Sequence, residues 1–228
     1  MSAEILHSLE EVLAPAHTAL LVIDVQNDFC HPEGGLARRG NDVSRLAALL
    51  DPISRLMEEA RAAGVLVICF RIVGSESTDS DAWAALSAGA EHELVPEGSW
   101  GAAYVDGLPV ELADLDLVKH RHSAFVGTGL DEELRRRGIR TVVLAGGVTN
   151  VCVEGTAREA ADRDYYVVVL EDATAAVRDD MHEMALTNVR RYLGLVGGRD
   201  ETTEIWRAAG AAATKSTEFD DEKKGARV

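Results

Sequence analysis

Five runs of apolar residues constrain the fold of this chain most strongly. They lie at 19–23, 65–70, 115–118, 141–145 and 166–170. As a set, the runs lack the apolar–polar alternation of a strand with one face in water. Such runs are typical of parallel strands that are buried between helices.

Helical spacing of apolar residues fills the intervals between these runs. Apolar residues recur at helical intervals over 46–57, at 130 and 134, after Cys152, and over 181–193, where Met184, Ala185, Val189 and Leu193 are predicted to face inward. Strand and helix therefore alternate. The pattern predicts an α/β three-layer sandwich, with a mostly parallel sheet and helices on both faces.

The 228 residues are expected to form a single domain over 18–210. Residues 1–17 are interpreted as an N-terminal extension. Residues 211–228 form a tail of small and then charged residues, for which an oligomer arm and disorder both stay open. Residues 74–107 break the strand–helix rhythm, and a lid over the active site or a surface excursion would explain them.

The charge balance limits the partners of this chain. The formal net charge is −16, and the densest basic run, 135–137, follows three acidic residues in a helical pattern. We interpret that run as a solvated helix face, because acids favour the first turn of a helix and bases the last. Nucleic acids and anionic membranes are therefore not expected as partners. A small-molecule substrate is expected as the partner.

Cysteine usage and the N-terminus indicate a cytoplasmic protein. Cys30, Cys69 and Cys152 show no CxxC spacing, which argues against a disulfide framework and a structural zinc site. The first residues carry acids rather than the basic and apolar regions of a signal peptide. No apolar run approaches the ~20 residues that span a bilayer.

Three chemically distinct residues follow the predicted strands. Asp24 ends the first run, Lys119 ends the third, and Cys152 follows the fourth through a turn with two glycines. The carboxyl ends of parallel strands meet at one edge of a sheet, where ligands bind. Each residue alone also has an ordinary interpretation, as a cap, a solvated lysine or a buried thiol.

The surroundings of Cys152 favour a nucleophile. A thiol at a helix N-terminus is expected to have a lowered pKa, because the positive end of the helix dipole favours the thiolate. Backbone amides at a glycine turn can stabilise an oxyanion. A carboxylate such as Asp24 can take the thiol proton, and an ammonium such as Lys119 can hold the developing negative charge.

Three stretches in this order resemble the isochorismatase-like cysteine hydrolases. They are 21–29 (LVIDVQNDF), 119–125 (KHRHSAF) and 146–158 (GGVTNVCVEGTAR). The resemblance extends over about 18–196. This family includes nicotinamidases, N-carbamoylsarcosine amidases, ureidoacrylate amidohydrolases and biuret hydrolases.

The resemblance implies a six-stranded parallel sheet and a triad of Asp24, Lys119 and Cys152. It also implies that the cysteine attacks a carbonyl carbon and that water resolves the thioester. A cis peptide is implied at Gly147–Val148, with the amides of Val148 and Cys152 as the oxyanion hole. A homo-oligomer, either a dimer or a tetramer, is implied as well.

Departures from the subgroups of the family narrow the expected chemistry. Nicotinamidases carry a metal-binding Asp-x-His cluster after the second strand, whereas residues 71–79 contain no histidine and His92 stands alone among acids. We therefore expect no metal and no cofactor. True isochorismatases often lack the cysteine, so Cys152 favours hydrolysis of a C–N bond in an amide, ureide or N-carbamoyl compound.

Six further residues are candidates for substrate binding: Asn27, Phe29, Trp100, Arg121, His122 and Asn150. The two aromatic residues could line the pocket, and Trp100 could instead only pack. Arg121 and His122 could contact a substrate carboxylate or ureido group. Arg121 could instead form a structural salt bridge. The two asparagines either donate to a substrate carbonyl or cap their turns.

Three other functions are alternatives to this hypothesis. A dinucleotide-binding protein would need G-x-G-x-x-G after the first strand, but no glycine occurs there before Gly34. A catalytically idle binding subunit is disfavoured by the intact triad. Acid-catalysed vinyl-ether hydrolysis remains as the alternative within enzymes, because that reaction needs no thiol.

Overall fold

The computed structural model describes residues 5–87 and 94–211 and contains one six-stranded sheet. Its strands are β1 (Thr18–Ile23), β2 (Leu66–Ile72), β3 (Leu115–Lys119), β4 (Thr141–Gly147), β5 (Tyr166–Ala175) and β6 (Leu195–Gly197). The order is β3-β2-β1-β4-β5-β6, and every neighbouring pair is parallel. The predicted α/β class with a parallel sheet is confirmed.

Burial along the strands follows their place in the sheet. Every residue of β1 and β4, the two central strands, is buried. The edge strand β3 instead alternates between exposed and less exposed residues until the buried Lys119. The expectation of two apolar faces is therefore wrong for β3, because an edge strand has a neighbour on one side only and Asp116 reaches solvent, where it contacts Arg71.

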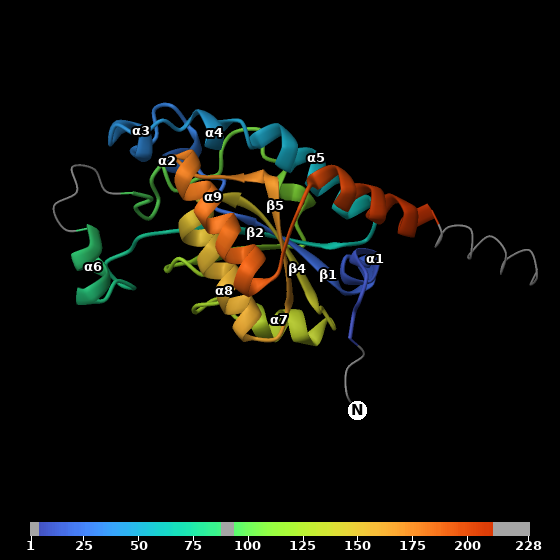
Figure 1. Cartoon of the computed structure of the whole chain (residues 1–228). Helices are drawn as coiled ribbons and strands as arrows, with labels where there is room; N and C mark the ends of the chain where they lie inside the picture. Colours follow the sequence, from blue (N-terminus) through green and yellow to red (C-terminus); the bar gives the residue numbers. More distant parts are fainter. Residues whose placement is uncertain (1–4, 88–93, 212–228) are drawn as a thin grey trace, which may run out of the picture.

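Helices cover both faces of the sheet, as right-handed crossovers require (Figure 1). Helix α5 (Leu50–Ala62) and the helical segment 199–211 lie on one face, and α7 (Leu130–Arg136), α8 (Glu154–Asp162) and α9 (Asp179–Asn188) lie on the other (Figure 1). The remaining helices are short: α1 (Leu9–Val12), η1 (Pro15–His17), α2 (Asn27–Cys30), α3 (Gly35–Arg38), α4 (Ser44–Ala47), α6 (Asp81–Ser87), η2 (Val110–Leu112), η3 (Thr149–Val153) and η4 (Val189–Leu193).

The predicted N-terminal extension contributes to the core. Leu13 is fully buried, and its carbonyl accepts a hydrogen bond from the indole Nε1 of the equally buried Trp206 at 3.1 Å. The hydroxyl of Thr141 donates to the carbonyl of Val12. Residues 5–17 therefore pack with the body that was predicted to begin at residue 18, while the tail beyond residue 211 lies outside the described residues.

One inward-facing prediction on α9 is wrong. Met184 is 63% exposed, whereas Leu186 is buried in its place. At Val189 the α-helical geometry of α9 changes to the π-helical geometry of η4. Val189 and Leu193 are buried, as expected.

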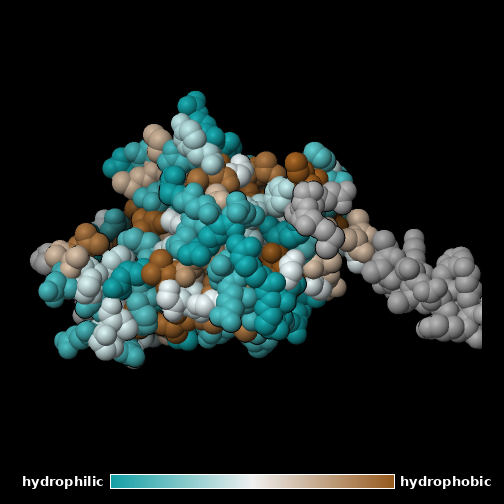
Figure 2. Space-filling view, turned by 90° about the horizontal axis from the view of Figure 1, so that it is seen from below, coloured by the Kyte–Doolittle hydropathy of each residue, from teal (hydrophilic) through white to brown (hydrophobic). Residues whose placement is uncertain are grey.

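The molecular surface is strongly polar. Figure 2 shows hydrophilic residues over much of one face, with hydrophobic groups scattered between them. The basic run 135–137 is exposed at the end of α7, as predicted for a solvated face, and Arg136 and Arg137 both contact Glu133. Among the residues that the structure describes, no helix is both long and apolar enough to cross a bilayer.

Candidate active site

The candidate site lies at the carboxyl edge of the sheet, where the strand order reverses between β1 and β4. From this point the chain winds outward through β2 and β3 on one side and through β5 and β6 on the other. Parallel sheets of this kind open a crevice at such a switch point. Asp24 follows β1 directly, and Cys152 follows β4 through the π-helical turn η3.

Asp24 and Lys119 form a buried ion pair. Lys119 Nζ lies 2.8 Å from Asp24 Oδ2, and both side chains are completely inaccessible to solvent. Asp24 has a φ of +51°, in the left-handed region that aspartate tolerates better than most residues. This conformation turns the chain out of β1 at the point where the carboxylate enters the site.

Lys119 reaches the carboxylate from two strands away, and its ammonium has other partners as well. Nζ donates to the backbone carbonyls of Arg121 at 3.1 Å and His122 at 3.0 Å. Burial by itself lowers the pKa of Lys119, but the negative charge of Asp24 and contact with Cys152 outweigh it and raise the pKa. The lysine is therefore a fixed positive charge and not a proton donor near neutral pH.

Burial raises the pKa of Asp24 above its ordinary value, against the opposing effect of the Lys119 ammonium and of hydrogen bonding with Lys119 and Cys152. A carboxylate with a raised pKa is a stronger base than an exposed aspartate. The arrangement therefore provides a base beside the thiol, and the charge of Lys119 favours the carboxylate form against the effect of burial.

Cys152 is almost buried and interacts with both members of the ion pair. Burial raises the pKa of its thiol, and the negative charge of Asp24 adds to this effect, whereas Lys119 opposes it. The expectation that the helix dipole lowers this pKa is thus wrong. Removal from water and a nearby anion both disfavour the thiolate and exceed the effect of the dipole. The resting cysteine is a thiol.

The turn before the cysteine is tightly packed against β1. Gly146 has a φ of +112°, and a Cβ on this residue would lie 2.0 Å from the carbonyl oxygen of Ile23. The peptide bond between Gly147 and Val148 is cis. After the turn, the hydroxyl of Thr156 donates to the carbonyl of Cys152 at 2.7 Å and accepts from the amide of Ala124 at 3.0 Å. Thr156 thereby ties the cysteine turn to the segment that follows Lys119.

A cavity of about 450 Å³ opens over the thiol of Cys152. Its wall is mostly apolar and includes Phe29, Trp83, Leu86, Val95, Val148 and Val151. Its polar side chains are Arg39, Asp79, His120, His122 and Cys152. An apolar pocket with a few polar groups suits a small organic molecule whose orientation those groups fix.

Two of the candidate substrate-binding residues line this cavity. Phe29 belongs to its wall, and His122 lies beside the nucleophile, with Nδ1 3.9 Å from Cys152 Sγ. Burial and the charge of Lys119 lower the pKa of His122, so its ring is neutral near neutral pH. Trp100 does not line the cavity but is 49% exposed and packs edge-on against His31.

The other three candidates serve local structure. Asn27 donates through Nδ2 to the carbonyls of Trp100 and Tyr104, which fixes the loop before β3. Arg121 lies 3.6 Å from Asp79 and stacks over the ring of Trp83. Asn150 contacts Met181 with its Nδ2 at 3.9 Å and does not belong to the cavity wall.

Sequence reasoning missed four polar or aromatic residues of the cavity: Arg39, Asp79, Trp83 and His120. Asp79 and Trp83 belong to the 74–107 segment, which the sequence marks as an insertion but whose path it does not define. His120 lies next to Lys119 in a recognised motif, and this proximity is a usable signal. The described part of 74–107 forms one wall of the cavity, and His92 lies outside the described residues.

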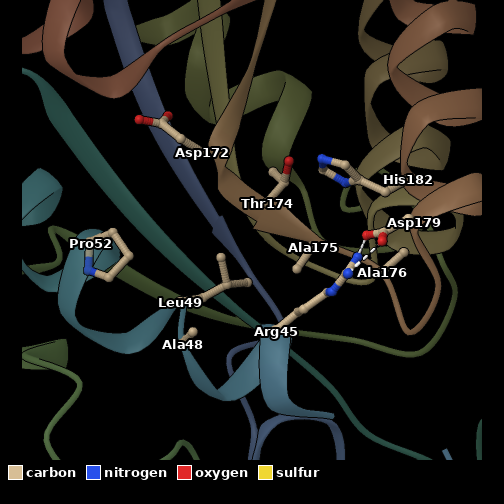
Figure 3. A pocket seen from close by; sticks show the side chains of 10 residues that line it. All are labelled: Arg45, Ala48, Leu49, Pro52, Asp172, Thr174, Ala175, Ala176, Asp179 and His182. Atoms are coloured by element: carbon tan, nitrogen blue, oxygen red, sulfur yellow. Dashed lines mark hydrogen bonds and ion pairs between the residues drawn. The ribbon is translucent and has the colours of Figure 1, made fainter. Parts of the chain in front are cut away.

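A second cavity, of about 330 Å³, lies behind the cysteine turn. Figure 3 shows its wall, with Arg45 and Asp179 joined across one side and His182 pointing toward Thr174. The His182 ring nitrogen Nδ1 also lies 2.9 Å from the hydroxyl of Thr149 in η3. His182 thus connects the wall of this cavity to the turn, and Cys152 is not among the residues that line it.

The described residues include no group of three or more His, Cys, Asp or Glu side chains with metal-ligand geometry. The prediction that catalysis needs no metal stays a prediction, for which a chelator provides the test.

Comparisons with known proteins show the family to which this chain belongs. A family model for the isochorismatase domain matches residues 18–201. Ureidoacrylate amidohydrolase RutB of Methylobacterium radiotolerans is 39% identical over 199 residues, covering 81% of this chain and 77% of that protein.

Two solved structures show the same fold. A cysteine hydrolase from Pseudomonas syringae pv. phaseolicola has a TM-score of 0.79 at 29% identity and covers 92% of this chain and 100% of its own. The N-carbamoylsarcosine amidase of Thermoplasma acidophilum has a TM-score of 0.63 at 28% identity, with coverages of 80% and 96%. This chain therefore belongs to the isochorismatase family.

Proposed function

We propose that this protein hydrolyses a C–N bond of a small amide, ureide or N-carbamoyl compound through a thioester on Cys152. The observation that carries the proposal is the buried Asp24–Lys119 ion pair beside a thiol that opens into a cavity of substrate size. The similarity to a ureidoacrylate amidohydrolase and an N-carbamoylsarcosine amidase supports the same bond type.

The first half of the reaction forms the thioester. Asp24 takes the proton of the Cys152 thiol as Sγ attacks the carbonyl carbon of the substrate, because the resting thiol is protonated. The amides of Val148 and Cys152 stabilise the oxyanion. Protonated Asp24 then gives its proton to the leaving nitrogen, the C–N bond breaks, and ammonia or an amine departs.

The second half releases the acid. A water molecule enters the place of the leaving group, and Asp24 takes one of its protons as the oxygen attacks the thioester. The C–S bond breaks, and the thiol recovers its proton from Asp24. The charge of Lys119 stays unchanged throughout and stabilises each negative charge that forms beside it.

The test is release of ammonia from a panel of small amides, ureides and N-carbamoyl compounds, by the wild type and by Cys152→Ala, before and after treatment with a chelator. The proposal predicts release by the wild type alone and no effect of the chelator. Full activity of Cys152→Ala on a vinyl ether would instead support acid-catalysed chemistry. No turnover of any compound would support an idle binding subunit.

A further inference from the structure

His120 is held in one tautomer by a hydrogen bond to the end of the neighbouring strand. Its Nδ1 lies 2.7 Å from the carbonyl oxygen of Val73, the residue after β2. A carbonyl oxygen can only accept a hydrogen bond, so Nδ1 must carry the proton. In the neutral ring the other nitrogen, Nε2, is then a hydrogen-bond acceptor.

This acceptor belongs to the side of the cavity away from the nucleophile. His120 follows β3 and is bonded to the end of β2, whereas Cys152 follows β4, with β1 between the two sides. Neighbouring strands are ~4.8 Å apart, so the backbone ends of β2 and β4 are separated by roughly 10 Å, and the side chains of His120 and Cys152 both line the cavity between them. A substrate whose carbonyl meets Cys152 can therefore extend toward His120.

Most of the surrounding wall is apolar, so each of its few acceptors has a large influence on selectivity. Trp83, Leu94 and Val95 line the cavity together with His120. A substrate N–H group that is desolvated here needs an acceptor, and a substrate without that hydrogen leaves the acceptor unpaired. An acceptor at this place would therefore favour a substrate nitrogen that bears hydrogen over one that does not.

We propose that His120 is a specificity-determining residue whose Nε2 accepts a hydrogen bond from the substrate. The substrate class is then a ureide or N-carbamoyl compound that keeps a hydrogen on the nitrogen facing away from Cys152. This inference rests on the proposed function. It specifies which compounds of the broad substrate class the cavity selects.

The test compares two compounds that differ by one methyl group, N-carbamoylglycine and N-carbamoylsarcosine. The wild type is expected to have a kcat/KM about tenfold higher for the compound with the N–H group. In His120→Asn the amide nitrogen replaces Nδ1 and can still donate to Val73, but no acceptor remains at the position of Nε2. This variant is expected to lose the preference between the two compounds.

His120→Gln is the matched control. Its amide oxygen can take the position of Nε2, so the preference for the N–H compound should be largely retained. Equal losses on both compounds in His120→Asn and His120→Gln would assign His120 a purely structural role and overturn the inference. A wild type without preference, or one that prefers the N-methyl compound, would overturn it as well.

Binding gives the same comparison without turnover. Calorimetry with the Cys152→Ser variant should show about tenfold tighter binding of N-carbamoylglycine than of N-carbamoylsarcosine. Equal affinities, or no binding of either compound, would overturn the inference. Turnover of other amides by the wild type would at the same time leave the proposed function standing, so the two failures are distinguishable.

Discussion

The ammonium of Lys119 lies 2.8 Å from Oδ2 of Asp24 in a place that water does not reach. Each charge is tolerated there because the other is present. Removal of one partner leaves an uncompensated charge in the interior, which costs far more than the loss of a pair at the surface. The same two residues thus determine both the stability of this part of the fold and the charge around the thiol.

Substitution of the lysine alone should be strongly destabilising. For Lys119→Met we expect the free energy of unfolding to fall by about 3–5 kcal/mol, because the buried carboxylate loses its partner. The double variant Asp24→Asn, Lys119→Met should be more stable than Lys119→Met, since no buried charge is left. Urea denaturation followed by circular dichroism measures both.

The exposed pair of Arg207 and Glu59 offers a control for the ion-pair experiment. Arg207→Met removes the same kind of contact in solvent and should change the unfolding midpoint little. If Lys119→Met changed the midpoint no more than Arg207→Met does, the buried pair would not have the role assigned to it.

The pH dependence of catalysis should show the raised pKa of Asp24. A general base acts only when ionised, so a raised pKa moves the acidic limb of kcat/KM to a higher pH than an ordinary aspartate would give. In Asp24→Asn, kcat/KM should fall by about 10²- to 10⁴-fold. Measurement of kcat/KM from acidic to neutral pH decides this; a limb at or below the ordinary aspartate range would exclude Asp24 as the base.

The close approach of β4 to β1 predicts a large effect of a single methyl group. Gly146→Ala should lower the free energy of unfolding by about 2–4 kcal/mol, since the residue has a positive φ and its Cβ would lie 2.0 Å from the carbonyl oxygen of Ile23. Gly198→Ala is the control, because nothing lies within 4 Å of its Cβ. Thermal denaturation measures the melting temperatures of both variants. Equal melting temperatures would contradict the close packing of β4 against β1.

Much of the fold was predictable because buried strands have a strong sequence signal. The runs at 19–23 and 141–145 became β1 and β4 with boundaries shifted by at most two residues. Strand β5 was predicted to end before Glu171 and Asp172 but continues to Ala175. Its pairing with β4 resumes after a bulge, with Gly146 opposite Thr174, and long-range pairing of this kind leaves no local pattern.

The site was predictable where a residue lies at the end of a strand. Asp24 and Lys119 meet because parallel strands bring their carboxyl ends together, which the order of the motifs already indicates. The pKa of Cys152 was not predictable, because it depends on burial and on a charge from another strand. The choice between the cavity wall and packing was not predictable for Trp100 for a similar reason, since its loop is fixed by the distant Asn27.

The central claim is that Cys152 forms a covalent acyl intermediate. Its most direct test is to quench the enzyme with acid during turnover of a substrate from the panel and to map the acyl adduct by mass spectrometry. Cys30 and Cys69 serve as internal controls, because burial raises the pKa of each to about 12 and neither lines the cavity. We expect the adduct on the peptide that contains Cys152 and on neither of the others. Unmodified Cys152 in the quenched enzyme, together with undiminished turnover by Cys152→Ala, would contradict the account.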